Sequence, residues 1–187
     1  MRIIGGQWRG RALTPVGKGD ASAHLRPTTD RTRESLFNML EGGRYGDPIT
    51  DARVLDLFAG TGALGLEALS RGAAAATFIE NGRIAQALTR KNIALCGADT
   101  ARLKSLDAAR LPANPDAPYD LVFLDPPYGQ WLGNLAMPIA LQGGWLADKA
   151  LVVWEDEAEP TPVAGLKRLD SRRYGDTVVT ILEAEGS

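Results

Sequence analysis

The residue pattern changes twice along the segment Val54-Leu-Asp-Leu-Phe-Ala-Gly-Thr-Gly-Ala-Leu-Gly65. It begins as an apolar run with one acid near its end. It then breaks at Gly60-Thr-Gly62 and resumes with apolar residues at helical spacing. This order predicts a buried parallel strand, a tight turn and a helix. Because Gly60 and Gly62 carry no side chain, the turn lets a ligand approach the backbone closely.

Two kinds of ligand suit such a turn, and both contain an adenosine. Gly60, Gly62 and Gly65 match the Gly-x-Gly-x-x-Gly spacing of dinucleotide-binding proteins, and Glu80 stands where an acid would bind the ribose. S-adenosylmethionine has the same ribose but no phosphate. Asp56 favours S-adenosylmethionine, because a carboxylate at the strand end faces a pyrophosphate badly but tolerates a positive sulfonium and amine. A dinucleotide oxidoreductase remains the alternative.

The chain of 187 residues is most simply one domain, 1–187, with a basic arm and helix over 1–44 and a cofactor-binding, catalytic core over 45–187. It has no apolar run long enough for a bilayer and no signal-peptide block, so we expect a cytoplasmic protein. Cys96 is interpreted as a buried helix residue, and His24 has no Cys or His near it in the sequence. We therefore expect no metal site, and nothing demands more than a monomer.

The charge is distributed unevenly along the chain. The net charge is −2, but residues 1–44 hold 8 Lys/Arg and 4 Asp/Glu, a net of +4, and the remainder holds 13 and 19, a net of −6. A basic segment on an acidic body favours a partner with phosphates. A merely solvated arginine-rich segment would show the same balance.

The first residues of the chain combine arginines with one tryptophan. Two short strand-like pieces flank Gly5-Gly6, which predicts a small hairpin. Basic and aromatic side chains together can contact RNA by charge and by stacking. The candidates for this contact are Arg2, Trp8, Arg9 and Arg11.

A helix is predicted after a polar loop over 14–29. Asp30 is the expected N-cap, and Gly42-Gly43 ends the helix. Arg31 and Arg33 lie near its N-terminus, where a positive charge opposes the helix dipole. This local cost suggests that both arginines serve a ligand or substrate, although solvated arginines are common.

The rest of the chain alternates between strand and helix patterns. This alternation predicts a mostly parallel sheet with helices on both faces, and a terminal hairpin predicts an antiparallel edge. The expected strands after the first are 74–79, 101–106, 119–124, 150–154, 166–173 and 177–183, with helices over 81–95 and 131–141.

Four acids share one position relative to these strands. Asp56, Glu80, Asp107 and Asp125 each fall at or just after the C-terminal end of a predicted parallel strand. Ligands bind open sheets of this kind at that edge. The sequence therefore predicts one binding site there.

The tetrapeptide Asp125-Pro-Pro-Tyr128 is the most specific feature of the chain. Consecutive prolines hold the backbone extended and remove two N–H donors. An ionised Asp125 and the Pro126 carbonyl then form a pair of acceptors for a group with two N–H bonds, and Tyr128 can lie flat on a planar ring. Such acceptors stabilise the positive charge that develops when a ring amine attacks a methyl group. Two alternatives remain for this tetrapeptide. Asp125 could act as a general base, or the two prolines could form a rigid turn that has no catalytic function.

Several segments in order extend this interpretation. They are Arg2-Ile-Ile-Gly-Gly, Arg26-Pro-Thr-Thr-Asp-Arg-Thr-Arg-Glu, Asp56-Leu-Phe-Ala-Gly-Thr-Gly, Asp125-Pro-Pro-Tyr and Tyr174-Gly-Asp-Thr. Over nearly its whole length the chain resembles the bacterial 16S ribosomal RNA guanine-N2-methyltransferase family (the RsmD type). The resemblance implies an α/β fold of the Rossmann-like class I methyltransferases. It also implies a seven-stranded, mostly parallel sheet with an antiparallel last strand, and a small N-terminal extension.

The same resemblance implies the activity and the site. The chain would methylate the N2 amino group of one guanine in the small ribosomal subunit or its assembly intermediate, using S-adenosylmethionine. Asp125, Pro126, Pro127 and Tyr128 would hold the guanine, and Arg31, Arg33 and the N-terminal cluster would face RNA. Glu80 would bind the ribose, and Asp107 would sit by the adenine. The cofactor-binding set is Asp56, Phe58, Gly60, Gly62, Glu80, Asn81 and Asp107.

Two further alternatives stay open. Adenine in DNA and glutamine in a protein also present a planar NH2, so the tetrapeptide alone does not exclude them as acceptors. A non-catalytic RNA-binding module would bind RNA without methyl transfer, but the cluster of strand-end acids argues against it.

Overall fold

The computed structural model describes residues 1–15 and 29–186 of the chain. Most of the predicted loop over 14–29 lies outside these residues. So do His24 and the first residues of the arginine-rich segment that starts at Arg26. Of the helices in the described part of the chain, none is both long and apolar enough to cross a membrane.

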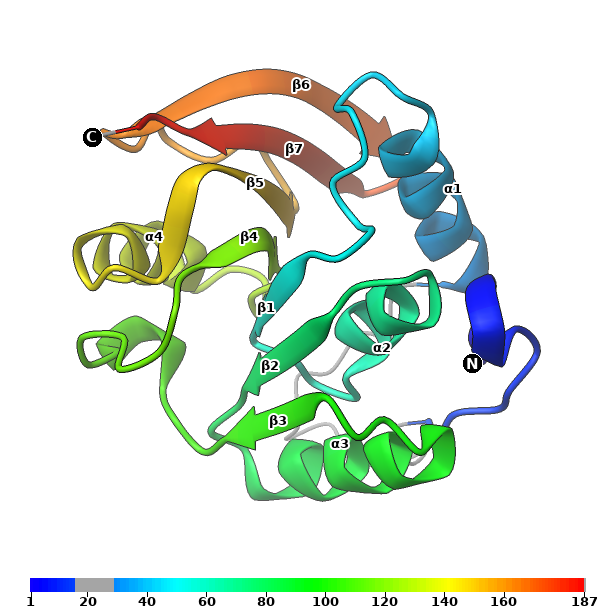
Figure 1. The fold of residues 1–187 in the computed structure, drawn as a ribbon. Helices are drawn as coiled ribbons and strands as arrows, with labels where there is room; N and C mark the ends of the chain where they lie inside the picture. Colours follow the sequence, from blue (N-terminus) through cyan, green and yellow to red (C-terminus); the bar gives the residue numbers. More distant parts are fainter. Residues whose placement is uncertain (16–28, 187) are drawn as a thin grey trace.

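Seven strands form one twisted sheet with the order β3-β2-β1-β4-β5-β7-β6 (Figure 1). Strands β1 to β5 pair in parallel, and β7 runs antiparallel to both β5 and β6. The predicted sheet with an antiparallel last strand is confirmed, although β7 lies one place inside the edge, which β6 occupies. The strands are β1 (Arg53–Leu57), β2 (Ala75–Ile79), β3 (Ala101–Lys104), β4 (Tyr119–Leu124), β5 (Leu146–Asp156), β6 (Leu166–Tyr174) and β7 (Thr177–Ala184).

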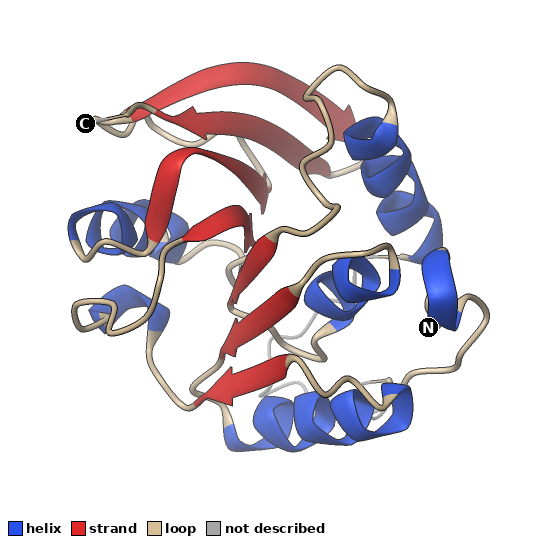
Figure 2. Cartoon of the chain, viewed as in Figure 1, coloured by secondary structure: helices blue, strands red, loops and turns tan. Residues whose placement is uncertain are grey.

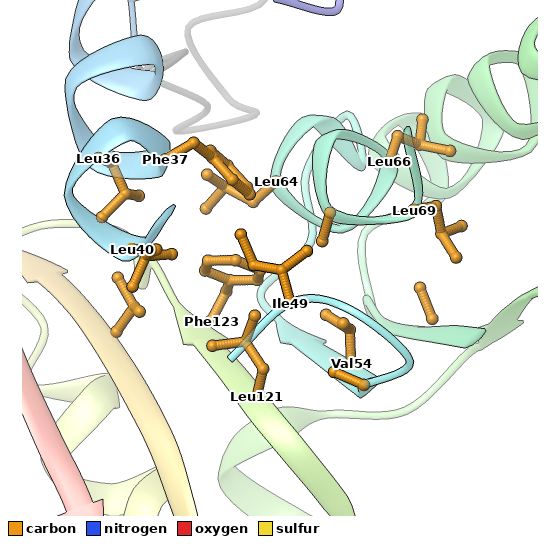
Figure 3. Packing of buried hydrophobic residues seen from close by; sticks show 14 of the residues in the cluster. Leu36, Phe37, Leu40, Ile49, Val54, Leu64, Leu66, Leu69, Leu121 and Phe123 are labelled. Atoms are coloured by element: carbon orange, nitrogen blue, oxygen red, sulfur yellow. The ribbon is translucent and has the colours of Figure 1, made fainter. Parts of the chain in front are cut away.

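Helices cover both faces of the sheet (Figure 2). One face carries α1 (Asp30–Glu41), α2 (Ala63–Ser70) and α3 (Arg83–Cys96), and the other carries α4 (Leu132–Gln142) and the short 3-10 helix η3 (Ala108–Arg110). Alternate residues of each central strand face opposite layers, so Val54 packs towards α2 while Leu55 packs towards α4. In the first layer Phe37 of α1 meets Phe123 of β4, with ring centroids 5.7 Å apart (Figure 3).

The N-cap of α1 is Thr29 rather than Asp30. Thr29 has extended backbone angles, and its hydroxyl accepts a hydrogen bond from the backbone N–H of Thr32 at 3.1 Å. Asp30 is instead the first helical residue, where its charge favours the helix dipole. Both residue types cap helices well, so local sequence alone did not distinguish them.

The first residues of the chain form an antiparallel pair that packs on α2. Arg2 bridges Ala12, but the connection is a 3-10 helix, η1 (Gly6–Trp8), rather than a tight hairpin turn. The backbone at Gly6 has φ +73°, and a Cβ there would lie 1.7 Å from the carbonyl oxygen of Ser70. The Gly5-Gly6 pair therefore permits close packing of this segment on α2.

Candidate functional site

The central strands end level with one another. Lys104, Ile79, Leu57, Leu124 and Trp154 pair across β3, β2, β1, β4 and β5 as a single row. Glu80, Phe58 and Asp125 are the residues that follow this row on β2, β1 and β4, and Asp107 comes three residues after it. The sheet therefore brings these predicted site residues to one edge, as we expected from the sequence.

The position of β1 divides this edge into two halves. Strands β2 and β3 lie on one side of β1, and β4 and β5 lie on the other, so the strand order reverses at β1. Ligands of open α/β sheets bind at such a switch point. Glu80 and Asp125 follow strands that are two places apart, roughly 10 Å at ordinary strand spacing.

The glycine turn after β1 is tightly curled. Phe58, Gly60 and Gly62 all have left-handed backbone angles, with φ of 60°, 59° and 77°. Two buried side chains of α3 hold the carbonyl groups of the turn. The Thr89 hydroxyl donates to the Gly60 carbonyl at 2.8 Å, and the Asn92 amide donates to the Thr61 carbonyl at 2.9 Å. These carbonyl groups therefore point towards α3.

Glu80 connects this turn to the start of α3. One carboxylate oxygen accepts a hydrogen bond from the backbone N–H of Gly60 at 2.9 Å, and the other accepts from Gly82 at 2.8 Å. The side chain is half-buried. A carboxylate oxygen has more than one lone pair, so a fixed and partly open Glu80 can still accept hydrogen bonds from a ligand.

Asp56 lies beneath the turn and is only 1% exposed. Its Oδ2 accepts a hydrogen bond from the backbone N–H of Gly65 in the first turn of α2, at 3.0 Å. In this structure its carboxyl group supports the turn from inside the protein. The contact between Asp56 and the cofactor stays a prediction.

The remaining residues predicted to bind cofactor lie beside the same edge. Asp107 caps η3 by accepting from the backbone N–H of Ala109 at 2.9 Å, and its side chain is 38% exposed. Asn81 is exposed between Glu80 and α3, and Phe58 is half-buried. All three follow the carboxyl ends of β1, β2 or β3, on the same half of the edge as Glu80.

The tetrapeptide Asp125–Tyr128 follows β4 without regular secondary structure. Asp125, Pro127 and Tyr128 are half-buried, and Pro126 is buried. The Tyr128 hydroxyl lies 2.8 Å from the hydroxyl of Thr177, the first residue of β7. The tetrapeptide is therefore joined to the start of β7, where the segment Tyr174-Gly-Asp-Thr ends.

The predicted RNA-contacting residues differ in their exposure. The exposed members of the set are Arg2, Arg9, Arg11 and Arg31. Trp8 is half-buried: its backbone N–H donates a hydrogen bond to the hydroxyl of Ser70, the last residue of α2, and its ring packs on the core. Arg11 donates to the carbonyl of Leu95 near the end of α3, at 2.8 Å. Trp8 and Arg11 thus lie at the ends of α2 and α3 that face away from the glycine turn.

Arg33 is buried, so the prediction that it faces RNA is wrong. Its side chain is 0% exposed and donates to Asp30 at 3.0 Å and to the Arg2 carbonyl, with Glu67 of α2 at 3.6 Å. Glu67 also accepts from the backbone N–H groups of Ile4 and Gly5, each at 2.8 Å. Arg33 and Glu67 therefore fasten the first residues of the chain to α1 and α2.

Three residues to which the sequence analysis assigns no role are connected to these segments in the structure. Glu67 and Thr177 act through partners far along the chain, which only the fold brings near. Trp131 could have been noticed, because it comes three residues after Tyr128, is 67% exposed and holds a left-handed angle of φ 55°. A hollow of about 590 Å³ lies at the opposite edge of the sheet, between the loop from Arg44 to Ala52 and Lys149, far from these residues.

Comparison with known proteins agrees with this geometry. The family model described as "Conserved hypothetical protein 95" matches residues 1–183. Ribosomal RNA small subunit methyltransferase D of Escherichia coli (strain K12) is 48% identical over 159 residues, 85% of this chain and 76% of that protein. Putative rRNA methyltransferase YlbH of Bacillus subtilis (strain 168) is 33% identical over 193 residues, 100% of both chains.

A solved structure matches the fold throughout. The structure of the putative methyltransferase yhhF from Escherichia coli has a TM-score of 0.84 at 43% identity, and the match covers 100% of this chain and 99% of that one. The Rossmann-like class I methyltransferase fold implied by the sequence is thereby confirmed.

Proposed function

Because the chain belongs to the family described as Conserved hypothetical protein 95, which includes ribosomal RNA small subunit methyltransferase D, we propose that it methylates the N2 amino group of a guanine in 16S ribosomal RNA, with S-adenosylmethionine as donor. One observation carries the proposal. Glu80 and the Asp125–Tyr128 segment end level at one edge of the sheet, on opposite sides of the glycine turn after β1.

The cofactor half lies over β1, β2 and β3. Phe58, Gly60 and Gly62 line the methionine part, and Glu80 accepts hydrogen bonds from the ribose hydroxyls, with Asn81 beside it. Asp107 accepts from the adenine amino group. The residues fit this ligand, because Glu80 is held in place by two backbone N–H groups while still partly exposed. When bound, S-adenosylmethionine supplies an electrophilic methyl group on a positive sulfonium.

The acceptor half lies over β4. Asp125 and the Pro126 carbonyl accept hydrogen bonds from the two N–H groups of the guanine amine, and the Tyr128 ring stacks on the base. The two acceptors withdraw the amine lone pair from conjugation and stabilise the positive charge that develops on nitrogen. Tyr128 fixes the plane of the base, which sets the direction of attack. The base reaches these groups only after it leaves its stack and turns into the pocket.

The exposed arginines supply the contact with the RNA backbone. Arg2 and Arg31 lie close together, since Asp30 next to Arg31 pairs with Arg2 at 3.7 Å. Arg9, Arg11 and the half-buried Trp8 lie further from the glycine turn. The name of the Escherichia coli relative refers to small-subunit RNA, and the form that we propose as substrate is the small ribosomal subunit or its assembly intermediate.

A methyl-transfer assay with tritium-labelled S-adenosylmethionine tests the proposal. Unmethylated small subunits, naked 16S RNA, DNA and protein are offered in parallel, and labelled RNA is digested to nucleosides. Label in N2-methylguanosine is the expected result, with small subunits labelled faster than naked RNA. Label only in DNA or protein would show that the acceptor is adenine or glutamine instead. RNA binding without any label would favour a non-catalytic binding module.

A further inference from the structure

The contact between Tyr128 and Thr177 joins two parts of the chain that lie 49 positions apart. The two hydroxyl oxygens are 2.8 Å from each other in a partly buried setting, and either one can donate the proton. Tyr128 closes the segment proposed to hold the acceptor base. Thr177 opens β7 directly after the turn at Gly175-Asp176.

The two partners differ in how their backbones are held. Thr177 pairs with Tyr174 of β6, and the next residue, Val178, pairs with Asp156 of β5. Strand β7 is thus held on both sides. Tyr128 lies in a stretch without helix or strand from Asp125 to Trp131. The rigid partner of this hydrogen bond is therefore Thr177.

Rotation about the Cα–Cβ bond moves the phenol ring and its hydroxyl oxygen together, so a hydrogen bond to that oxygen restricts the swing of the whole ring. We propose that Thr177 is a positioning residue that holds the Tyr128 ring in the orientation that stacks on the acceptor base. This inference rests on the proposed function. Small displacements of a reacting group lower rates strongly, because catalysis depends on near-attack geometry.

Four variants isolate the hydroxyl contact. Thr177→Val keeps the branched shape and removes the hydroxyl, whereas Thr177→Ser keeps the hydroxyl. Tyr128→Phe removes the other partner, and the double variant closes a mutant cycle. We expect Thr177→Val to lower kcat for RNA methylation about 3- to 10-fold, the size of one hydrogen bond. Thr177→Ser should stay within about 2-fold of wild type, and Thr177→Val should add nothing in the Tyr128→Phe background.

A matched control lies on the same strand. Thr180 of β7 is fully buried, and its hydroxyl has no hydrogen-bond partner among the described residues. Thr180→Val therefore makes the same chemical change on β7 without touching Tyr128, and we expect unchanged methylation. The dissociation constant for S-adenosylhomocysteine should stay the same in all variants, since the contact lies on the acceptor half.

A second readout does not depend on activity. In protein labelled at its tyrosine rings, Thr177→Val should shift the Tyr128 ring signals in the NMR spectrum, and Thr180→Val should leave them in place. Unchanged ring signals, or an equal loss of kcat from Thr177→Val in the Tyr128→Phe background, would overturn the positioning role. If wild type transfers no methyl group to RNA, the proposed function fails, while the ring signals still decide whether Thr177 orients Tyr128.

Discussion

Asp56 and Gly65 are joined by a hydrogen bond that ties β1 to the first turn of α2. The Asp56 carboxyl oxygen accepts from the Gly65 backbone N–H at 3.0 Å. A Cβ at residue 65 would lie 2.4 Å from the Phe78 ring and 3.2 Å from the same oxygen, so only glycine fits there. Burial raises the pKa of Asp56 to about 8, and the nearby Glu80 charge adds to this, while the Gly65 hydrogen bond acts in the opposite direction. At neutral pH the folded protein therefore holds Asp56 mostly protonated.

This pKa makes the stability of the protein depend on pH in a definite direction. Between about pH 4 and pH 8 the folded state binds a proton at Asp56 that the unfolded chain has lost, so the contribution of Asp56 to stability falls as pH rises, and it is constant above about pH 8. Asp56→Asn keeps an acceptor for Gly65 and removes the titration. We expect the free energy of unfolding of Asp56→Asn, relative to wild type, to rise between pH 5 and pH 8. Urea unfolding at three pH values measures this, and a constant difference would contradict it.

Glu80→Ala should weaken cofactor binding more than the chemical step. The substitution removes the proposed ribose acceptor and leaves the N–H groups of Gly60 and Gly82 without their carboxylate partner. Hydrogen bonds to charged groups contribute about 1.5–3 kcal/mol, so we expect the dissociation constant for S-adenosylhomocysteine to rise roughly 10- to 150-fold. Titration calorimetry measures it. Glu157→Ala, an exposed acid after β5, is the control, and an unchanged constant in Glu80→Ala would contradict the ribose assignment.

Asp125→Ala should lose turnover while cofactor binding persists. Asp125 lies on the acceptor half, so its removal leaves the cofactor half intact but takes away an acceptor that stabilises developing charge. Groups of this kind contribute about 10²- to 10³-fold to kcat. Single-turnover methylation measures the loss, with the S-adenosylhomocysteine dissociation constant as the second readout. Asp120→Ala changes an exposed aspartate at the other end of β4 and should retain turnover. A near-normal rate in Asp125→Ala would end the proposed role.

Arg31 and Arg33 form a matched pair on α1 with opposite surroundings. Arg33 is buried against Asp30 and Glu67, and Arg31 is exposed. Arg33→Met should lower the free energy of unfolding by about 3 kcal/mol, the lower end for breaking a buried ion pair, because Glu67 keeps Arg71 as a partner. Arg31→Ala should leave stability nearly unchanged and reduce both RNA affinity and its salt dependence. Urea unfolding measures the stability of both variants, and filter binding at two salt concentrations measures their RNA affinity. Equal losses of stability in Arg31→Ala and Arg33→Met would contradict the assignment of Arg33 as the buried, structural arginine.

Trp131 should report on RNA binding by its fluorescence. It is 67% exposed and follows the acceptor segment, whereas Trp145 and Trp154 are fully buried and Trp8 is half-buried. If the base enters over Asp125–Tyr128, RNA should protect Trp131 from quenching by acrylamide. Trp131→Phe should abolish most of this RNA-dependent change. Quenching that RNA does not alter would place the acceptor elsewhere on the surface.

The sequence predicted the elements well where local pattern and burial coincide. Strand β4 was predicted with its observed bounds because 119–124 is an almost continuous apolar run between prolines. Strand β5 begins four residues earlier than predicted, at Leu146, because Asp148 and Lys149 are exposed and interrupt the apolar pattern. The register shift between β4 and β5 at this point has no local sequence signal.

The sequence predicted which residues lie at the strand ends, but not which side chains are buried behind them. Glu80 and Asp125 could be placed because strand ends are visible in the sequence. Arg33 could not, since an exposed and a buried arginine look alike until Glu67, 34 positions later, is brought beside it. The hydrogen bond from Gly65 to Asp56 has no signal in the sequence either, because the glycine pattern indicates a turn and not the partner of its backbone N–H.

The level row from Lys104 to Trp154 has a consequence for how such proteins diverge. Each side chain that reaches the proposed ligands comes after the row, in segments that lie outside the paired strands. Loops after β4 can therefore vary in length and composition without shifting the register of β1, β2 and β3. Evolution can thus exchange one methyl acceptor for another while inheriting the donor site intact.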